Sequence, residues 1–443
     1  MEAMPVVAIG PMMERIIGLY ENTGYPFVSV RLDTIRYADD LLRGKLVISP
    51  GDRFRVDSIM NRTGYRISNK LLGRIAGIRP GDVYSEQAVR EAATRLSSVR
   101  WLAMKRPSEV GFHDQSASLF VYPAKAAANR FDGWIGLSAG SAGSALSVAG
   151  ALTLELINPA GQGDAWNFNW KRSQDQSQNL RLSLDIPWLA SLPVGISATF
   201  GLHRQDTSYL NLEWEAGVPY SFNVNHHLNL FYRYQNSTLL VRNPTATPAG
   251  RLPYSVWLTG LSWKWEQWDN PVNPSTGFSL MAEASTGLKT IEDSSALRQS
   301  EFLGDISWFQ PVAGNLVFAL RARAGYKQTP ESLENEAFRL GGAAILRGFY
   351  EDTYRSNSFV TGSLELRYLL NQYSHILLLA DLGCLDNLSG GIATRVWPYG
   401  IGAGGQLRTA GGIFQIIFAV GQEIGQSVNL STGKIHIGYI GLF

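Results

Sequence analysis

Apolar and polar residues alternate with a period of two along most of the chain after about residue 130. Because successive side chains of a β-strand point to opposite faces, each alternating run predicts a strand with one apolar and one polar face. One run has Leu180, Leu182, Leu184 and Ile186 on one face and Asn179, Arg181, Ser183 and Asp185 on the other. About sixteen runs begin near residues 131, 145, 165, 178, 193, 207, 226, 252, 277, 298, 315, 357, 374, 396, 412 and 433.

Composition favours a membrane barrel over a soluble β-sandwich for these runs. Only 17% of the residues are charged, 11% are aromatic, and no apolar run reaches the length of a transmembrane helix. In a barrel the apolar face of each strand meets lipid and the polar face lines the lumen, and an even strand number is usual. Six tryptophans are candidates for the interfacial girdles: Trp257, Trp263, Trp265, Trp268, Trp308 and Trp397. We predict a transmembrane antiparallel β-barrel of about sixteen strands over residues 130–443.

The first part of the chain has a mixed pattern. A helical pattern at residues 12–21 precedes strand-like runs at 26–37 and 44–49. A second set of elements then follows: a strand at 53–60, a helix between Ser68 and Gly77, a helix after Ser85, and strands at 99–106 and 116–123. Serine is a favoured N-cap and glycine a favoured C-cap, which supports both helices. The pattern predicts a small α+β region, with a helix–strand–strand set of elements followed by a strand–helix–helix–strand–strand set.

One stretch between two alternating runs has a different character. Residues 340–349 read LGGAAILRGF, with Gly341, Gly342 and Gly348 around a single arginine. Glycine permits backbone conformations that other residues resist, and arginine offers a rigid fork of donors that stays charged. The stretch predicts a long, re-entrant loop whose arginine docks at a specific place. An ordinary surface loop with a solvated arginine is the alternative.

Four short motifs occur in an order that resembles the BamA/TamA superfamily of outer-membrane assembly and translocation proteins. They are LRGF at 346–349 after two glycines, DNPVNP at 269–274 with Gly277, DLG at 381–383, and the terminal Phe443. The resemblance covers nearly the whole chain. It identifies 1–52 as the C-terminal part of a polypeptide-transport-associated (POTRA) module, 53–125 as a complete POTRA module, and 130–443 as the barrel.

The resemblance also implies a function. Members of the superfamily insert barrel proteins into the outer membrane or translocate a polypeptide, so unfolded outer-membrane or secreted clients are the expected partners. POTRA modules would lie in the periplasm and capture client strands on their edges. The seam between the first and last barrel strands would receive those strands. Outer-membrane lipids are expected around the barrel, and accessory lipoproteins are a further partner class.

The same resemblance supplies the candidate site. Arg347, with Gly348 and Phe349 beside it, is expected to enter the lumen and pair with Asp381 as a loop-lumen lock. Asp381 shares its parity with Leu377 and Leu379, yet a carboxylate facing lipid would be expensive, so we assign it to the lumen. Glu365 and Asp305 are fallback partners. We expect the pair to be partly hydrated, and hence weaker than a fully buried ion pair.

The C-terminus supplies a second candidate feature. Phe443 is in phase with Tyr439, Ile437 and Ile435, so its ring is expected to face lipid at the periplasmic rim. By resemblance, Phe443 and Tyr439 belong to an assembly signal. The glycine-rich first strand, with Gly133, Gly136, Gly140 and Gly143, is consistent with a weak seam, because interior glycines destabilise strands.

Three apparent chemical motifs carry little weight. Residues 136–140 match G-x-S-x-G, but no helix pattern follows, as a nucleophile elbow requires. Gly400, Gly402 and Gly405 match a dinucleotide fingerprint, again without a helix. His226 and His227 are adjacent and would point to opposite faces of a strand. We therefore expect no enzyme activity, no cofactor and no metal.

Charge, cysteine content and the N-terminus add three smaller expectations. The formal net charge of +2 argues against a nucleic-acid partner. The single cysteine, Cys384, cannot form an internal disulfide. No signal peptide opens the sequence, so we interpret it as a mature or truncated chain.

Two alternative functions stay open at this point. One is a passive outer-membrane channel, against which the two N-terminal modules argue. The other is a membrane anchor for a hydrolase domain encoded upstream, because such fusions occur in the superfamily. The N-terminal sequence of the full-length gene product would separate the second alternative from the favoured reading.

Overall fold

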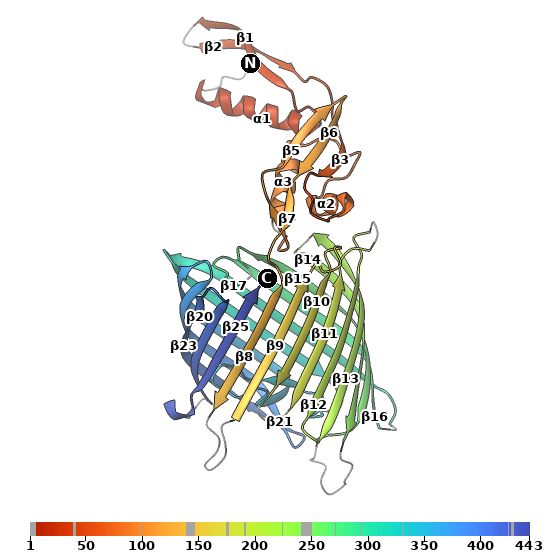
Figure 1. The fold of residues 1–443 in the computed structure, drawn as a ribbon, viewed down its shortest axis with the longest axis vertical. Coiled ribbons are helices and arrows are strands. Elements are labelled where there is room, and N and C mark those ends of the chain that lie inside the picture. The colour runs from red at the N-terminus through yellow and green to blue at the C-terminus, as the bar shows by residue number, and fades with distance from the viewer. Residues whose placement is uncertain are drawn as a thin grey trace. The chain divides into compact units, whose positions relative to one another are not determined.

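The computed structural model describes residues 6–38, 41–97, 99–138, 147–173, 177–189, 192–223, 225–240, 250–270, 272–292, 294–329, 331–423, 425–426 and 429–443. The chain divides into two compact units, Met1–Ala127 and Ala128–Phe443 (Figure 1). The first unit mixes helices and strands, and the second is built of strands with one short 3-10 helix. Among the described residues, no helix is both long enough and apolar enough to cross a membrane.

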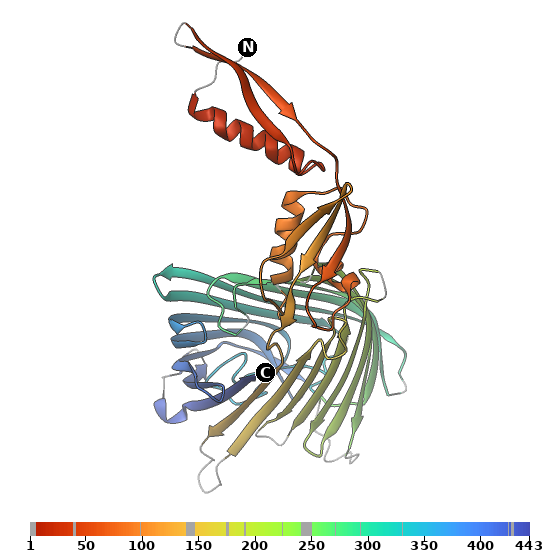
Figure 2. The ribbon, with the colours of Figure 1, turned by 45° about the horizontal axis from the view of Figure 1, so that its top comes forward.

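The first unit begins with a helix and a hairpin. A short 3-10 helix, η1 (Val6–Ala8), leads into α1 (Ile9–Glu21), and β1 (Ser29–Ala38) pairs with β2 (Leu41–Ser49) in antiparallel fashion. Figure 2 shows α1 running alongside this hairpin. Phe27 packs against the elements that follow, with its ring centroid 5.5 Å from that of Phe54 and 4.9 Å from that of Phe112. The side-chain oxygen of Asn22 accepts a hydrogen bond from the Gln87 amide at 2.8 Å, so it also caps the helix that starts there.

The rest of the first unit contains seven elements: β3 (Arg55–Asn61), α2 (Asn69–Ala76), α3 (Glu86–Ser97), β4 (Leu102–Met104), β5 (Glu109–His113), β6 (Ser116–Val121) and β7 (Pro123–Lys125). Both helices start as serine caps predict: Ser68 accepts from the Leu71 amide and Ser85 from the Ala88 amide, each at 3.2 Å. Gly77 ends α2 in the left-handed conformation, with φ at 72°.

The strand expected at 99–106 is wrong in extent. Only Leu102–Met104 forms a strand, β4, and it pairs with β7 rather than with the main sheet. The main sheet has the order β3-β6-β5, with β3 and β6 parallel and β5 and β6 antiparallel. The turn between β5 and β6 uses Asp114 and Gln115 at φ 42° and 62°. Glycine or asparagine normally marks such a turn, so the β5–β6 hairpin left no clear signal in the sequence.

The second unit is a closed barrel of sixteen antiparallel strands, which confirms the predicted fold class. Its strands are β8 (Arg130–Ser138), β9 (Ser147–Ile157), β10 (Ala165–Arg172), β11 (Gln178–Ile186), β12 (Ile196–Gln205), β13 (Tyr209–Asn223), β14 (His226–Leu239), β15 (Tyr254–Trp268), β16 (Gly277–Ile291), β17 (Leu297–Ala313), β18 (Leu316–Gln328), β20 (Tyr354–Asn371), β21 (Ser374–Ser389), β22 (Ile392–Val396) continued by β23 (Pro398–Arg408), β24 (Ile413–Glu423) and β25 (Lys434–Leu442). Each begins within four residues of its predicted start. The short β19 (Phe338–Leu340) lies inside the connection after β18 and pairs with β20. A 3-10 helix, η2 (Leu430–Thr432), precedes β25.

Exposure alternates along the barrel strands as the sequence pattern predicts. On β21, Ile376, Leu378 and Leu382 are about half exposed and point outward, whereas Leu377 and Leu379 are buried inside. Trp257, Trp308 and Trp397 are also about half exposed on the outer surface. The outer face is therefore apolar and aromatic, as a lipid-facing surface requires.

The seam of the barrel is the pairing of β25 with β8. We call the end where β8 begins and β25 ends the proximal end, and the opposite end the distal end. Eight residue pairs join β25 to β8, against seven between β24 and β25 and nine between β8 and β9. The seam is thus closed over a length similar to that of its neighbours. Gly133 and Gly136 lie in it, while Gly140 and Gly143 lie outside the described residues; seam weakness stays a prediction.

Candidate functional site

The distal connection between β18 and β20 enters the barrel lumen and places Arg347 against the wall. We call residues 329–353 the luminal loop. The Arg347 guanidinium holds Asp381 in a fork, with Nε 2.9 Å from Oδ2 and Nη2 2.6 Å from Oδ1. The Arg347 amide also donates to Asp381 Oδ2 at 2.8 Å. This bidentate geometry fixes orientation as well as contributing energy.

Arg347 has further partners on β20. Its Nη1 donates to Glu365 Oε1 at 2.5 Å, and its Nη2 donates to the Ser363 hydroxyl. Arg367 approaches the other oxygen of Glu365, with Nε 2.7 Å from Oε2. Glu365, a fallback candidate, is therefore a second partner, whereas Asp305 is not, because it binds Arg323 at 2.7 Å. Burial lowers the pKa of Arg347, but Asp381 and Glu365 raise that pKa by more, so its charge is secure.

The ion pair is buried, so the expectation of a partly hydrated pair is wrong. The side chain of Arg347 is 6% exposed and that of Asp381 is 0% exposed. Asp381 lies on the luminal face together with Leu377 and Leu379, and these two leucines pack on Ile417 and Ala419 of β24. Removing one partner of such a pair typically costs about 3–5 kcal/mol.

Glycines let the loop tip lie directly on the barrel wall. A Cβ on Gly400 of β23 would lie 2.1 Å from the Arg347 carbonyl oxygen, and a Cβ on Gly348 would lie 2.4 Å from the Gly421 amide of β24. A Cβ on Gly421 would come within 2.6 Å of the Phe349 ring. Gly348 has φ at 96°, which other residues resist. Backbone meets backbone at this contact, and a side chain would separate the two.

The turn before Arg347 also requires glycine. The Gly342 amide donates to the Leu346 carbonyl at 3.2 Å, which closes a tight turn. Gly341 and Gly342 have φ of 119° and 95°. A Cβ on Gly341 would lie 2.6 Å from the Tyr350 carbonyl oxygen. The glycine pattern of 340–349 therefore encodes the re-entrant path of the loop.

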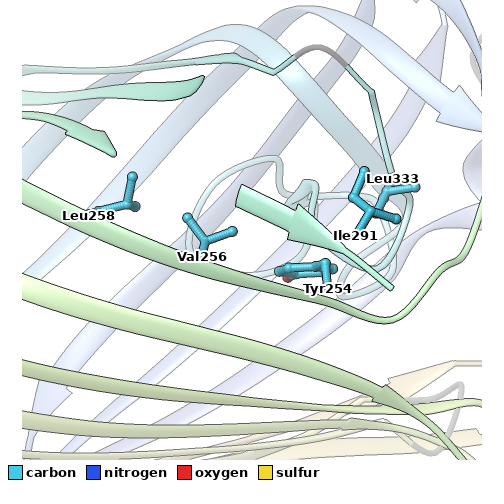
Figure 3. Close-up of a cluster of buried hydrophobic side chains, with 5 residues drawn as sticks. All are labelled: Tyr254, Val256, Leu258, Ile291 and Leu333. Carbon is cyan, nitrogen blue, oxygen red and sulfur yellow. The ribbon is translucent and has the colours of Figure 1, made fainter. Parts of the chain in front are cut away.

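Apolar residues anchor the same loop, and sequence reasoning missed them. Leu340 and Leu346 are buried in a cluster with Tyr354, Phe359 and Leu385, against which Phe349 packs. Nearer the start of the loop, Leu333 packs in a second cluster with Tyr254, Val256, Leu258 and Ile291, which Figure 3 shows. Leucines within a loop sequence favour docking of the loop against the rest of the protein. The leucines of 340–346 were such a signal in the sequence.

Charged side chains hold the first half of the loop. Lys289 of β16 is fully buried and lies 2.5 Å from Glu336 Oε2. Lys327 of β18 lies 3.0 Å from Glu301 and 3.6 Å from Glu336. Asn335 donates to the Ser237 hydroxyl at 2.7 Å. None of these partners was singled out from the sequence, because a lysine within an alternating strand looks like any polar luminal residue.

The proximal half of the lumen is open and cationic. A cavity of about 410 Å³ lies between Arg347 and the proximal end. Its lining includes Arg130, Arg321, Arg323 and Arg367 beside Asp305. The luminal loop thus occupies part of the distal half of the barrel, and the cavity lies on its proximal side.

The remaining predicted site residues lie at the proximal end. Ile435 and Ile437 are exposed on the outer face of β25, and Phe443 is 54% exposed in the same phase. Tyr439 donates its hydroxyl to the Gly411 carbonyl at 2.5 Å and packs on Phe414 with 5.1 Å between ring centroids. The assembly role of Phe443 and Tyr439 stays a prediction.

The DNPVNP motif forms the proximal turn between β15 and β16. Asp269 accepts hydrogen bonds from the Ser275 amide at 2.9 Å, the Thr276 amide at 3.2 Å and the Ser275 hydroxyl at 2.5 Å. Asn270 donates to the Gln372 carbonyl at 3.0 Å, which ties this turn to the one between β20 and β21. Pro271 lies outside the described residues. The motif is therefore a structural turn.

The apparent enzyme motifs lie on strands. Gly400, Gly402 and Gly405 are all in β23, which leads into β24 and not into a helix. Residues 136–138 continue β8, and Ala139 and Gly140 lie outside the described residues. His226 accepts from the Trp263 indole at 2.6 Å, and His227 contacts Ser221. Within the described part of the chain, no group of three or more His, Cys, Asp or Glu residues is placed to hold a metal ion.

Comparison with known proteins adds a family and a fold. Residues 158–439, more than half of the chain, match the profile of the Omp85 superfamily domain. No curated protein matches the sequence.

Several solved structures share the fold at low identity. BamA from Haemophilus ducreyi, in a structure lacking POTRA domains 1–3, superposes with a TM-score of 0.60 at 15% identity over 99% of this chain and 94% of that one. CdiB from Acinetobacter baumannii gives a TM-score of 0.60 at 14% identity over 95% and 79%. CdiB from Escherichia coli gives 0.59 at 13% identity over 99% and 85%.

Proposed function

This chain belongs to the Omp85 superfamily, and from that premise we propose that it inserts or translocates client polypeptides at the bacterial outer membrane. One observation carries the proposal: the luminal loop is docked through a buried Arg347–Asp381 pair inside a barrel that is closed at its seam. A pore built for passive flow does not need such a loop. A loop held by an ion pair and backbone contacts can instead be released and docked again as clients pass.

We propose that 1–52 and 53–125 are POTRA modules in the periplasm, the first of them incomplete in this chain. The order β3-α2-α3-β5-β6 supports this assignment. In the main sheet β6 is central, so β3 and β5 are the edges. Residues 79–84 cover part of β3, because Val56 and Phe54 exchange backbone hydrogen bonds with Asp82, Gly81 and Tyr84. Among the described residues no backbone partner lies along the outer edge of β5, so Glu109–His113 is the edge proposed to receive a client strand.

The proposal needs no chemistry. The luminal site contains an arginine, two carboxylates and glycines whose hydrogen bonds are mutually satisfied, and it holds the loop in place. We therefore propose a non-enzymatic role without a cofactor, with unfolded outer-membrane or secreted polypeptides and membrane lipids as partners. Accessory lipoproteins remain a proposed partner class.

Reconstitution of the full chain into liposomes tests this function. An unfolded barrel client is added outside, and its folded, heat-modifiable fraction is compared for the wild-type chain, an Arg347→Lys variant and empty liposomes. We expect the wild type to raise the folded fraction and the variant to lose most of that gain. Protease protection of a second, non-barrel client inside the liposomes distinguishes translocation from insertion. If the wild type shows neither insertion nor translocation but gives a steady ion conductance, the result would instead support a passive channel.

Protease treatment of intact cells tests the topology. If 1–125 lies in the periplasm, externally added protease leaves it intact, and cleaves it only after the outer membrane is permeabilised. Cleavage within 53–125 on intact cells would contradict the proposed placement.

A further inference from the structure

Six consecutive residues of the luminal loop contact strands on both sides of the barrel seam. We call Arg347 to Asp352 the strap. Its first residue binds β20 and β21 and lies with its carbonyl on Gly400 of β23, and the next two residues lie on Gly421 of β24. Tyr350 then meets β25, with Lys434 Nζ 4.1 Å from its ring centroid. The strap therefore follows the wall strand by strand up to the seam.

Beyond the seam the strap is held by β10. Lys171 Nζ lies 2.7 Å from Glu351 Oε2 and 2.9 Å from Asp352 Oδ1. The Ser173 hydroxyl donates to the other oxygen of Asp352 at 3.1 Å. The two carboxylate side chains are only 7% and 9% exposed, and that of Lys171 is 28% exposed. Partial burial makes these ion pairs stronger than those of a freely solvated surface.

The local backbone is arranged for this contact. The Ala343 amide donates to Glu351 Oε1 at 2.7 Å, so the carboxylate has a second fixed partner. A Cβ on Gly342 would lie 1.9 Å from that oxygen, so any other residue there would displace the Glu351 carboxylate. Asp352 has φ at 59°, a conformation that non-glycine residues adopt only when other contacts hold them.

The attachments lie on opposite sides of the seam in the strand order. β25 pairs with β8, β8 with β9, and β9 with β10, so Lys434 and Lys171 are on strands that the seam separates. Six residues span at most about 20 Å even when fully extended. If β8 moved away from β25 and carried β9 and β10 with it, the strap would have to lose one of its two attachments.

We propose that Lys171, with Glu351 and Asp352, forms a latch that holds the barrel seam closed, and that this latch opens before a client segment enters the seam. The opening of the latch before client entry rests on the proposed function, whereas the closure of the seam by the latch concerns the barrel alone. The β10 end is the part that releases, because Lys171 is the more exposed attachment, whereas Arg347 is held by three buried side chains.

Hydrogen–deuterium exchange of the full chain in lipid nanodiscs tests the latch without any client. The reporters are the seam amides of 130–137 and 435–442. Lys171→Met removes the charge and keeps the side-chain stem. We expect it to accelerate exchange of both seam segments about fivefold to tenfold, the factor that loss of a partly buried ion pair gives.

Two matched variants make the test specific. Lys171→Arg retains the positive charge and is expected to keep seam exchange within about twofold of wild type, a difference too small to indicate local opening. Lys264→Met removes a lysine of β15 that lies 3.1 Å from Glu266 and has no hydrogen bond or ion pair to the described part of the loop, and it should leave the seam unchanged. If Lys171→Met yields too little folded barrel, Glu351→Gln with Asp352→Asn removes the same ion pairs from the loop side.

The outcomes separate the latch from the function. Faster exchange at 343–352 with unchanged exchange at the seam would overturn the latch, because the strap would then be loose without any effect on the seam. Equal acceleration by Lys171→Met and Lys264→Met would also overturn it. If the seam loosens as expected in Lys171→Met but the wild-type chain neither assembles nor translocates a client, the result would support the latch and refute the proposed function.

Discussion

Asn129 and Phe443 exchange two backbone hydrogen bonds at the proximal end of the seam. The Asn129 amide donates to the Phe443 carbonyl at 3.2 Å, and the Phe443 amide donates to the Asn129 carbonyl at 3.1 Å. This pair continues the register of β8 and β25 by one step beyond Arg130 and Leu442. The Asn129 side chain in turn accepts from the Ile157 amide at 3.0 Å. The last residue of the chain therefore takes part in closing the barrel.

Deleting Phe443 is expected to lower barrel assembly more than Phe443→Tyr does. The deletion removes both hydrogen bonds with Asn129, worth about 1–3 kcal/mol together, as well as the outward ring. Tyrosine keeps the backbone pair and an aromatic ring at the lipid interface. The measurement is the yield of heat-modifiable barrel in outer membranes at equal expression. Equal yields of the two variants would contradict the prediction.

Asp269 makes the β15–β16 turn sensitive to acid. Burial raises the pKa of Asp269, but the hydrogen bonds from Ser275 and Thr276 lower it by more, so the pKa lies below its usual value. A lowered pKa in the folded state means that the stabilisation is complete above the ordinary aspartate value and is lost as the pH falls below it. We expect Asp269→Asn to destabilise the barrel by about 1 kcal/mol at pH 7, since the carboxylate is partly solvated.

That cost should shrink at low pH. As the pH falls through the lowered pKa of the Asp269 carboxyl, the wild-type side chain becomes protonated, so the wild type and Asp269→Asn should converge in stability. Urea unfolding of the barrel in detergent micelles at pH 7, 5 and 3 measures the difference. Asp206→Asn is a useful comparison, because this carboxylate caps a distal turn by accepting from the Ser208 amide. A difference for Asp269→Asn that stays constant from pH 7 to pH 3 would count against the carboxylate as the cause.

The barrel was predictable from the sequence because one constraint acts on every strand. Lipid on one side and a polar lumen on the other force strict alternation, so each of the sixteen strands left its own signal. The β5–β6 hairpin in the first unit had no such constraint. Its strand Glu109–His113 is short, and its turn uses Asp114 and Gln115 where glycine would have marked the position. Local turn chemistry alone was too weak a signal there.

The candidate site was predictable only in part. The glycines and Arg347 stand out because their conformational and charge properties are unusual, and resemblance indicated Asp381. Lys171 and Gly421 could not be assigned, because their importance depends on which strand lies opposite the loop. The depth of burial was also missed. Leu377 and Leu379 share the luminal face with Asp381, and this parity already indicated a dry environment.

The Arg347–Asp381 pair should show strong energetic coupling. Lysine lacks the planar fork that binds Asp381 through two nitrogens, and Asp381→Ala leaves the buried guanidinium with one carboxylate, Glu365, and the Ser363 hydroxyl. We expect each single change to loosen the luminal loop by about 3 kcal/mol or more while the barrel still forms. The readout is the modification rate of Ala337→Cys, a buried loop position, in a Cys384→Ser background.

A double-mutant cycle with a matched pair decides the result. If the residues interact, the double variant costs clearly less than the sum of the two single changes; full additivity would mean that they act separately. Arg323→Lys and Asp305→Ala form the comparison. This pair is 2.6 Å apart on neighbouring strands, is 43% and 27% exposed, and has no hydrogen bond or ion pair to the described residues of the loop. Changing either residue should alter the free energy of loop docking by about 0–1 kcal/mol.

Gly400→Ala tests whether the loop tip needs direct contact with the wall. The new methyl would lie 2.1 Å from the Arg347 carbonyl oxygen, so the tip must lift or β23 must shift. Such overpacking typically costs about 1–3 kcal/mol. Gly362→Ala is the control, because Gly362 lies on barrel strand β20 in phase with the outward-facing Val360 and Leu364, with no heavy atom within 4 Å of the added Cβ. We expect Gly400→Ala to accelerate hydrogen exchange at 341–352 and to impair client assembly, and Gly362→Ala to do neither. Wild-type protection of 341–352 in Gly400→Ala would show that the tip tolerates separation from β23.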